Sequence, residues 1–283
     1  MVAVLGQGLI DPEQPAIRAD DLGLTRGDGC FESTRVVTGA DGRHRVDHLD
    51  RHLDRMDRSC AGLDLPPVDR AGWLALIDQA LAGWTRPGEA MLRLMLTRGR
   101  ESTPDGPITG VLTLTPLAPE TVRQRREGID VITLDRGIHS AAYTDAGWLL
   151  GGVKTLSYGV NVAALRQARR RGADDVLFRS SDGFVLEAPT ATAVWLVDGI
   201  LHTTPTGSTG VLASITQLAL FEAARSAGFQ TRSALATPAE LVAAEGLWLV
   251  SSGRGVAAVR TVDGVALDGK PGVTAQLSEL AGF

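Results

Sequence analysis

The sequence contains few lysines, few cysteines and few aromatic residues. Lys154 and Lys270 are its only lysines among 28 basic residues, and Cys30 and Cys60 are its only cysteines. Two cysteines exclude a disulfide-rich scaffold, and the opening residues MVAVLGQGLIDPEQ lack the basic start and apolar stretch of a signal peptide. We therefore expect a cytoplasmic protein.

Long apolar runs and an excess of positive charge are absent as well. No apolar segment reaches the roughly 20 residues that a membrane-spanning helix needs. Acidic residues outnumber basic ones, 33 to 28, so the chain lacks the basic balance typical of nucleic-acid binding. These absences leave small molecules as the expected partners, rather than nucleic acid or a membrane.

The chain does have enough apolar sequence for one or two domains, with 283 residues of which 44% are hydrophobic. Strand-like and helix-like segments alternate along its whole length, which predicts an α+β protein. The stretch TPLAPETVRQRREG combines two prolines with a run of charge and is the best linker candidate, although its charges also suit a solvated helix face. We expect a small N-terminal domain at 1–117, a linker at 118–127 and a larger C-terminal domain at 128–283.

Hydrophobic periodicity predicts the individual elements. The expected helices are 46–61, 70–82, 160–171 and 214–227. The expected strands are 34–38, 91–97, 110–117, 129–134, 175–179, 184–187, 193–197, 247–250 and 256–262.

The scarcity of lysine indicates that a remaining lysine could have a chemical role. The other 26 basic residues are arginines, which serve wherever a surface cation is sufficient. Arginine cannot replace lysine where a neutral amine must attack a carbonyl, because a guanidinium stays protonated. Lys270, in the turn-like DGKPG, is interpreted as a solvated loop residue. Lys154 follows a short apolar run with two glycines and precedes a helical pattern, and it is the candidate reactive amine.

Three further features are each ambiguous alone. The glycine-rich stretch before Ser214 enters a helix whose unpaired backbone N–H groups suit a phosphate. Taken alone, an ordinary helix cap at Ser214 or Thr216 is the better explanation. Arg55 could clamp a phosphate or simply pair with nearby aspartates. Glu187, at the end of a predicted strand, could project into a cleft or lie on the surface.

His48 and His52 stand four residues apart, as two metal ligands on a helix would. No HExxH motif and no third ligand accompany them, so we predict no metal site.

Together, a reactive lysine, a carboxylate, an arginine and a phosphate-accepting helix start are what pyridoxal 5'-phosphate requires. The lysine would form a Schiff base with the aldehyde, and the carboxylate would keep the pyridine nitrogen protonated. Once released, the lysine would move the substrate's Cα proton as general base and acid.

Five motifs, in order along nearly the whole chain, resemble those of the fold-type IV pyridoxal-phosphate enzymes. This group comprises branched-chain aminotransferases, D-amino acid aminotransferases and 4-amino-4-deoxychorismate lyases. The motifs are DLGLTRGDGCFESTRVV, HLDRM, GGVKTLSYGVNVAAL, DDVLFRSSDGFVLEAPTATAVWLV and TGVLASITQ.

The resemblance implies a role for each matched residue. Lys154 would be the Schiff-base lysine and catalytic base, and Glu187 would bind the pyridine nitrogen. Arg55 and the backbone of Ile215 and Thr216 would bind the phosphate. Thr190 and Ser252, or its neighbour Ser251, would make further contacts to the cofactor. Phe31, Arg35 and Arg98 match positions that line the substrate pocket.

The same resemblance implies a small N-terminal domain, a larger C-terminal pseudo-barrel domain, cofactor in the cleft between them, and a homodimer. Three positions depart from the family pattern. Gln217 stands where many relatives have arginine. Residues 188–192 replace the usual run of small residues and an asparagine. Phe31 replaces the tyrosine that D-amino acid aminotransferases use on the substrate carboxylate.

The GDGCF and LTRG segments look most like aminodeoxychorismate lyase, which forms 4-aminobenzoate and pyruvate for folate synthesis. Glu32 stands where aminotransferases often carry the same acid, which favours instead the transamination of a D-amino acid or a branched-chain amino acid. A third hypothesis is a pyridoxal-phosphate carrier without catalysis. Specificity in such pockets depends on a few contacts, so the first two reactions stay open at this point.

Overall fold

The computed structural model describes residues 1–283, which divide into two units. The first unit comprises Met1–Ala118 and Val153–Tyr158, and the second comprises Pro119–Gly152 and Gly159–Phe283. The C-terminal domain expected from the sequence spans all of 128–283. The short segment around Lys154 instead belongs to the first unit, because it hydrogen-bonds to strand β3 (Gly29–Thr38) there.

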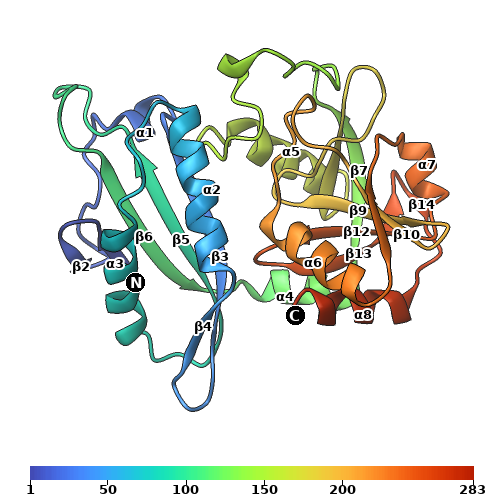
Figure 1. Ribbon diagram of the computed structural model, residues 1–283, viewed down its shortest axis with the longest axis horizontal. Coiled ribbons are helices and arrows are strands. Elements are labelled where there is room, and N and C mark those ends of the chain that lie inside the picture. Colours follow the sequence, from blue (N-terminus) through green and yellow to red (C-terminus); the bar gives the residue numbers. More distant parts are fainter. The chain divides into compact units, whose positions relative to one another are not determined.

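The first unit is built on a six-stranded antiparallel sheet in the order β2-β1-β6-β5-β3-β4. Helices α2 and α3 cover one face of it (Figure 1). Its elements are β1 (Val2–Val4), β2 (Gly8–Ile10), α1 (Leu22–Thr25), β3 (Gly29–Thr38), β4 (His44–Val46), α2 (Leu49–Gly62), α3 (Arg70–Ala82), β5 (Gly88–Thr97) and β6 (Thr109–Pro116).

Alternation along the strands decides which side chains enter the core of the first unit. Leu92, Leu94 and Leu96 on β5 point toward the helices and are buried, while Arg93 between them is exposed. From α2, Leu53, Met56 and Cys60 meet this face at helical spacing. The α2 helix begins three residues later than predicted, because Val46 belongs to β4 and His48 takes the left-handed conformation, with φ of 50°.

A charged cluster is buried between β3 and α2. Glu32 is only 1% exposed, and its carboxylate accepts hydrogen bonds from Nε and Nη2 of Arg55, both at 2.7 Å, and contacts Nδ1 of His52 at 2.7 Å. Burial alone would raise the pKa of Glu32, but the hydrogen bonds from Arg55 and His52 outweigh it and lower the pKa to about 2. Burial also lowers the pKa of His52, against the opposing effect of Glu32.

The second unit has an eight-stranded mixed sheet in the order β11-β10-β9-β12-β13-β7-β8, with β14 paired to β13. Its strands are β7 (Ile129–Asp135), β8 (Asp175–Arg179), β9 (Thr192–Val197), β10 (Ile200–Thr203), β11 (Gln230–Ser233), β12 (Gly246–Ser251), β13 (Gly255–Val262) and β14 (Val265–Ala266). Its helices are α4 (Pro119–Glu127), the short 3-10 helix Gly147–Leu149, α5 (Gly159–Arg170), α6 (Ile215–Ser226), α7 (Pro238–Val242) and α8 (Pro271–Leu280).

The central strands of this sheet are apolar on both faces, as strands covered on both sides must be. Val194, Trp248 and Val250 point to one face and pack under α6 and α8, which lie side by side (Figure 1). On the other face, Trp195 and Leu249 pack with α7. No helix in the structure is both long and apolar enough to cross a membrane.

Two expectations from the sequence need correction. The segment predicted as a linker forms helix α4, and Arg125 on it donates to the backbone carbonyls of Gly253 and Arg254 within the second unit. The segment 184–187 is not a strand, because only Val185 forms a bridge to β8, to Arg179. Its remaining hydrogen bonds to β8 and to Ala236 hold it in an irregular path.

Core packing gives a first prediction. Leu112 is fully buried beneath the helices of the first unit, so Leu112→Ala should lower the free energy of unfolding by about 2–5 kcal/mol through lost burial and the cavity left behind. Leu24→Ala is the matched control, because Leu24 is 67% exposed. Chemical denaturation measures both, and an equal loss in the two variants would contradict the assigned core.

The buried histidine gives a second prediction, on pH. The folded state holds His52 neutral below its usual pKa, so the unfolded chain takes up a proton first as the pH falls through about 6.5. Stability is therefore lost from pH 7 to pH 5, at no more than about 1.4 kcal/mol per pH unit for one proton. His52→Gln should flatten this slope in urea unfolding at pH 5, 6 and 7.

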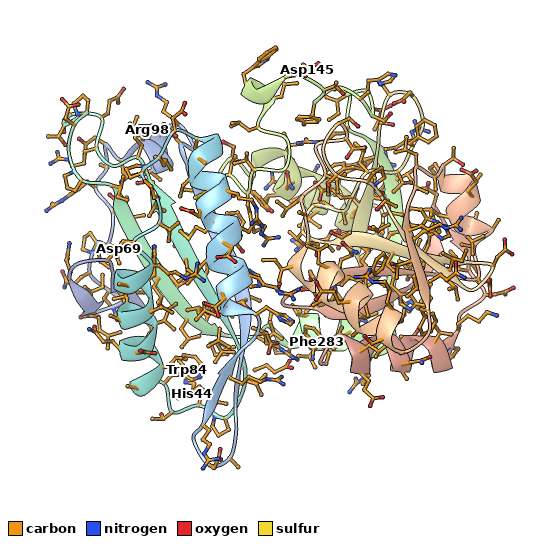
Figure 2. All side chains as sticks on the ribbon, in the orientation of Figure 1. His44, Asp69, Trp84, Arg98, Asp145 and Phe283 are labelled. Atoms are coloured by element: carbon orange, nitrogen blue, oxygen red, sulfur yellow. The ribbon has the colours of Figure 1, made fainter.

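Glu32 does not contribute to this pH window. Its lowered pKa adds stability that is present above the ordinary carboxyl range and lost only as the pH falls toward about 2. His44→Gln, in strand β4 of the same unit, is the control for removing a histidine (Figure 2). A slope in His52→Gln that matches that of His44→Gln would refute the assignment.

Candidate active site

A short segment of backbone around Lys154 pairs with the edge of β3. Strand β4 covers this edge only at residues 36–38, and the segment at 154–156 covers it further along. Phe31 N donates to Lys154 O at 3.0 Å, Leu156 N donates to Gly29 O at 2.9 Å, and Cys30 bridges Thr155 in antiparallel register. Phe31 and Lys154 are therefore opposite one another, and their side chains share a face.

Two glycines of the GDG motif make this approach possible. A Cβ at Gly29 would collide with the carbonyl oxygen of Leu96 and lie 2.8 Å from Cδ1 of Leu156. Gly27 has φ of 71°, and a Cβ there would lie 2.5 Å from Oγ of Ser157. The motif therefore leaves room for the lysine segment to run against β3.

The amine of Lys154 lies between two aromatic rings. Its Nζ is 4.2 Å from the ring centroid of Phe31 and 5.5 Å from that of Tyr158, and it donates to Oη of Tyr158 at 3.3 Å. The backbone N of Lys154 donates to Oγ of the buried Ser59 on α2 at 3.2 Å. Tyr158 is not among the residues predicted from the sequence, although its position four residues after the lysine could have suggested it.

The predicted phosphate ligand Arg55 lies on the opposite side of β3. It projects from α2 into the buried cluster, where Glu32 binds two of its nitrogens. Glu32 thus fixes the orientation of this guanidinium. His52 completes the same cluster, while His48 precedes α2, and the structure contains no group of three or more potential metal ligands.

The three predicted substrate residues have different surroundings. Phe31 is beside the lysine, as described. Arg35 shares the Phe31 face of β3 but is buried, with ion pairs to Asp47 and Glu89 at 2.7 Å each.

Arg98 lies just beyond β5 near the end of α2 (Figure 2). It donates to Asp28 at 2.6 Å and to the Leu63 carbonyl at 2.5 Å, so its guanidinium is already engaged within the first unit.

One arginine on the Phe31 face was not singled out from the sequence. Arg93 on β5 is exposed, its Cζ lies 6.0 Å from the Phe31 ring centroid, and its Nε donates to the Ser33 hydroxyl at 3.3 Å. The alternation of β3 and β5 could have found it, because Ser33 and Arg93 are direct partners in the ladder.

In the second unit, Glu187 is connected to the glycine-rich loop. Its backbone carbonyl accepts from Phe178 N at 2.9 Å, which ties the residue to β8. Its Oε2 accepts from Leu212 N at 3.3 Å, so the carboxylate reaches the loop that leads into α6. Thr190 follows at an exposed turn, which Asn161 holds by donating to the Pro189 carbonyl at 2.7 Å.

The start of α6 matches the predicted helix entry. Ser214 caps it by accepting from Gln217 N at 3.3 Å, as expected from the sequence. The backbone N–H groups of Ile215 and Thr216 therefore stand in the first turn, at the positive end of the helix dipole. The Thr216 and Ser252 hydroxyls are 3.0 Å apart, which places Ser252, rather than Ser251 on β12, beside this helix start.

The turn that carries Ser252 is anchored by a buried ion pair. Arg254 donates to Asp175 at 2.6 Å, and both side chains are almost fully buried. Arg125 on α4 adds hydrogen bonds to the carbonyls of Gly253 and Arg254 at 3.0 and 2.8 Å. These contacts fix the turn against the sheet and so fix the Ser252 hydroxyl.

Comparisons with known proteins identify the family of the chain. The family model for amino-transferase class IV matches residues 29–262. The chain is 38% identical over 281 residues, covering 96% of it and 94% of the relative, to a bifunctional aminodeoxychorismate lyase / D-amino acid transaminase from Mycobacterium tuberculosis.

Solved structures give the same result. A hypothetical aminotransferase from Mycobacterium tuberculosis superposes with a TM-score of 0.93 at 39% identity in its PLP-bound form, over 99% of this chain and 98% of that one. A fold IV-transaminase from Curtobacterium pusillum superposes with a TM-score of 0.89 at 40% identity, over 98% of this chain and 91% of that one. The chain therefore has the α+β fold of the fold-type IV enzymes and belongs to the class IV aminotransferase family, whose members use pyridoxal phosphate.

Proposed function

We propose that this chain is a pyridoxal-phosphate-dependent 4-amino-4-deoxychorismate lyase that forms 4-aminobenzoate and pyruvate. The observation that carries the proposal is the 38% identity, over 96% of the chain, to a bifunctional aminodeoxychorismate lyase / D-amino acid transaminase. The GDGCF and LTRG segments support the lyase activity of that pair. Action in the cytoplasm and assembly as a homodimer remain predictions from the sequence.

The residues present fit this cofactor chemically. Lys154 would bind the aldehyde, and Glu187 would hold a proton at the pyridine nitrogen. Arg55 and the backbone N–H groups of Ile215 and Thr216 would bind the phosphate, where a helix start and a guanidinium both favour anions. Thr190 and Ser252 would provide further polar contacts. When bound, pyridoxal phosphate supplies an electron sink for the carbanion that proton removal leaves.

The chain's own contribution centres on the Lys154 amine. Hydrogen bonds to β3 and to Ser59 fix its backbone, so only the side chain of Lys154 has to move. The Phe31 and Tyr158 rings restrict where the amine can go. Lys154 would remove the ring proton at the amine-bearing carbon of the substrate, after which pyruvate leaves as the ring aromatises.

The substrate carries carboxylates, and arginines near Phe31 would receive them. Arg98 and Arg35 are the candidates from the resemblance, but both already pair with carboxylates of the first unit. Arg93 on the same face as Phe31 pairs with a neutral hydroxyl, which a substrate carboxylate can displace more easily. We therefore add Arg93 to Phe31, Arg35 and Arg98 as a proposed substrate contact.

Transamination of a D-amino acid is the second candidate, with a branched-chain substrate as a variant of it. The same relative carries D-amino acid transaminase activity in its name, and the Curtobacterium pusillum protein is described as a transaminase. Both reactions begin with the removal of a proton by the same lysine, so one chain can support the two. A pyridoxal-phosphate carrier without catalysis would bind the cofactor but turn over neither substrate.

The attachment site gives a third prediction. Treatment with an equimolar amount of pyridoxal phosphate followed by borohydride reduction should add one cofactor to the peptide that contains Lys154, as measured by mass spectrometry. Lys154→Ala should lose this label. Lys270→Ala is the matched control and should keep it, because Lys270 sits just before α8 beside Glu245 at 3.7 Å. Label on Lys270, or on Lys154→Ala, would refute the assignment.

The choice of reaction gives a fourth prediction. Incubation of the loaded protein with aminodeoxychorismate should release 4-aminobenzoate and pyruvate in equal amounts, with Lys154→Ala as the inactive control. A parallel incubation with D-alanine and 2-oxoglutarate reports transamination as D-glutamate, because pyruvate is formed in both reactions. D-glutamate without 4-aminobenzoate would contradict the lyase proposal and support the transaminase. If neither product forms, the hypothesis that stays is a pyridoxal-phosphate carrier without catalysis.

A further inference from the structure

The hydroxyl of Tyr158 lies beside the amine on which the proposed function depends. The chain turns back after the β3 pairing, with Tyr158 N donating to Leu156 O at 2.7 Å, and this returns the tyrosine to the lysine four residues earlier. Its Oη is 3.3 Å from Lys154 Nζ. Its ring packs edge-on against Phe31, with centroids 5.0 Å apart and an interplanar angle of 78°. The tyrosine is thus fixed by both backbone and ring contacts.

The two aromatic rings offer the amine different interactions. The face of Phe31 stabilises only the charged form of the amine. A phenol accepts a hydrogen bond from an ammonium group and donates one to the lone pair of a neutral amine. Tyr158 can therefore stay bonded to Lys154 in both protonation states, and a general base has to pass through both.

Two other hydroxyls near the lysine segment are bonded to backbone groups. Ser59 Oγ accepts from the backbone N of Lys154 at 3.2 Å, and Ser157 Oγ donates to the Gly27 carbonyl at 3.4 Å. Charged groups of the first unit near the Lys154 and Tyr158 pair include Arg93, over the same Phe31 ring, and the Glu32 cluster with His52 and Arg55 behind β3.

We propose that Tyr158 is a further catalytic residue, whose hydroxyl holds the Lys154 amine and adjusts its hydrogen bond as the amine gains and loses a proton. When Lys154 takes a proton from substrate carbon, the new N–H donates to Oη. When Lys154 gives the proton up, the phenol O–H donates to the nitrogen lone pair, so the tyrosine stays neutral throughout. The proposal rests on the function proposed above for Lys154. Tyr158 lies within the motif GGVKTLSYGVNVAAL, but the resemblance gave it no role.

The experiment compares Tyr158→Phe with Tyr143→Phe. The chain has only these two tyrosines, and Tyr143 is in the second unit, where it packs against Gly151 and Gly210. Phenylalanine keeps the ring that packs on Phe31 and removes only the hydroxyl, so folding should be preserved in both variants and is checked by thermal unfolding.

The first readout uses protein without cofactor. Competitive acetylation across a pH series reports the ionisation of each lysine, and Lys270 serves as the internal reference because the chain has only two lysines. A hydrogen bond to the charged amine is stronger than one to the neutral amine, so its loss should lower the pKa of Lys154 in Tyr158→Phe. Lys154 should then label at lower pH, with Lys270 unchanged.

The second readout uses the loaded enzyme with whichever substrate the wild type accepts. Tyr158→Phe should lower kcat about tenfold, with KM within about twofold, and should enlarge the deuterium isotope effect on the transferred proton. The acidic limb of the pH profile should move in the same direction as the labelling. Tyr143→Phe should match the wild type in every measurement.

Labelling or turnover in Tyr158→Phe that is indistinguishable from Tyr143→Phe overturns the proposal. Labelling that shifts while kcat and the isotope effect stay unchanged overturns the catalytic role as well. The labelling is done without cofactor or substrate, so it separates a failure of this proposal from a failure of the proposed reaction.

Discussion

The pairing of residues 154–156 with the edge of β3 is the constraint on which the site of the first unit depends. Two backbone hydrogen bonds set its register, and they place Lys154 opposite Phe31. Because successive side chains of a strand point to opposite faces, a slip of one residue would turn the lysine toward α2 and the buried Glu32. The glycines of the GDG motif keep the register by leaving no side chain between the two backbones.

Glu32, the next residue along β3, points to the opposite face of the sheet from Phe31. Phe31 faces the lysine, whereas Glu32 faces α2 and binds Arg55 and His52 inside the protein. A buried carboxylate costs stability unless it is paired, and the loss of one partner leaves an uncompensated charge. The pairing orients the Arg55 guanidinium before any ligand arrives, so a ligand that binds it does not have to order a long side chain.

The sequence predicted local features well and long-range contacts poorly. Helix α3 and the Ser214 cap of α6 follow from neighbouring residues, and both agree with the structure. The place of Lys154 in the first unit depends on pairing with a strand more than a hundred residues away, which no local period reveals. Tyr158 was missed because it lies in a turn, where spacing carries little information. The segment 184–187 has a strand-like sequence, but its hydrogen bonds are shared between β8 and Ala236.

If both candidate reactions use Lys154 as proposed, the recognition of substrate carboxylates, rather than proton removal, would separate them. Arg35 donates to two carboxylates, and Arg98 donates to a carboxylate and a backbone carbonyl, so a substrate carboxylate would have to compete with these partners. A carboxylate bound at Arg93 would replace its 3.3 Å hydrogen bond to the Ser33 hydroxyl by a charge-assisted hydrogen bond, which is the stronger of the two. A substrate whose carboxylate reaches the Phe31 face of the sheet is therefore favoured over one whose carboxylate must reach Arg98 beyond the end of β5.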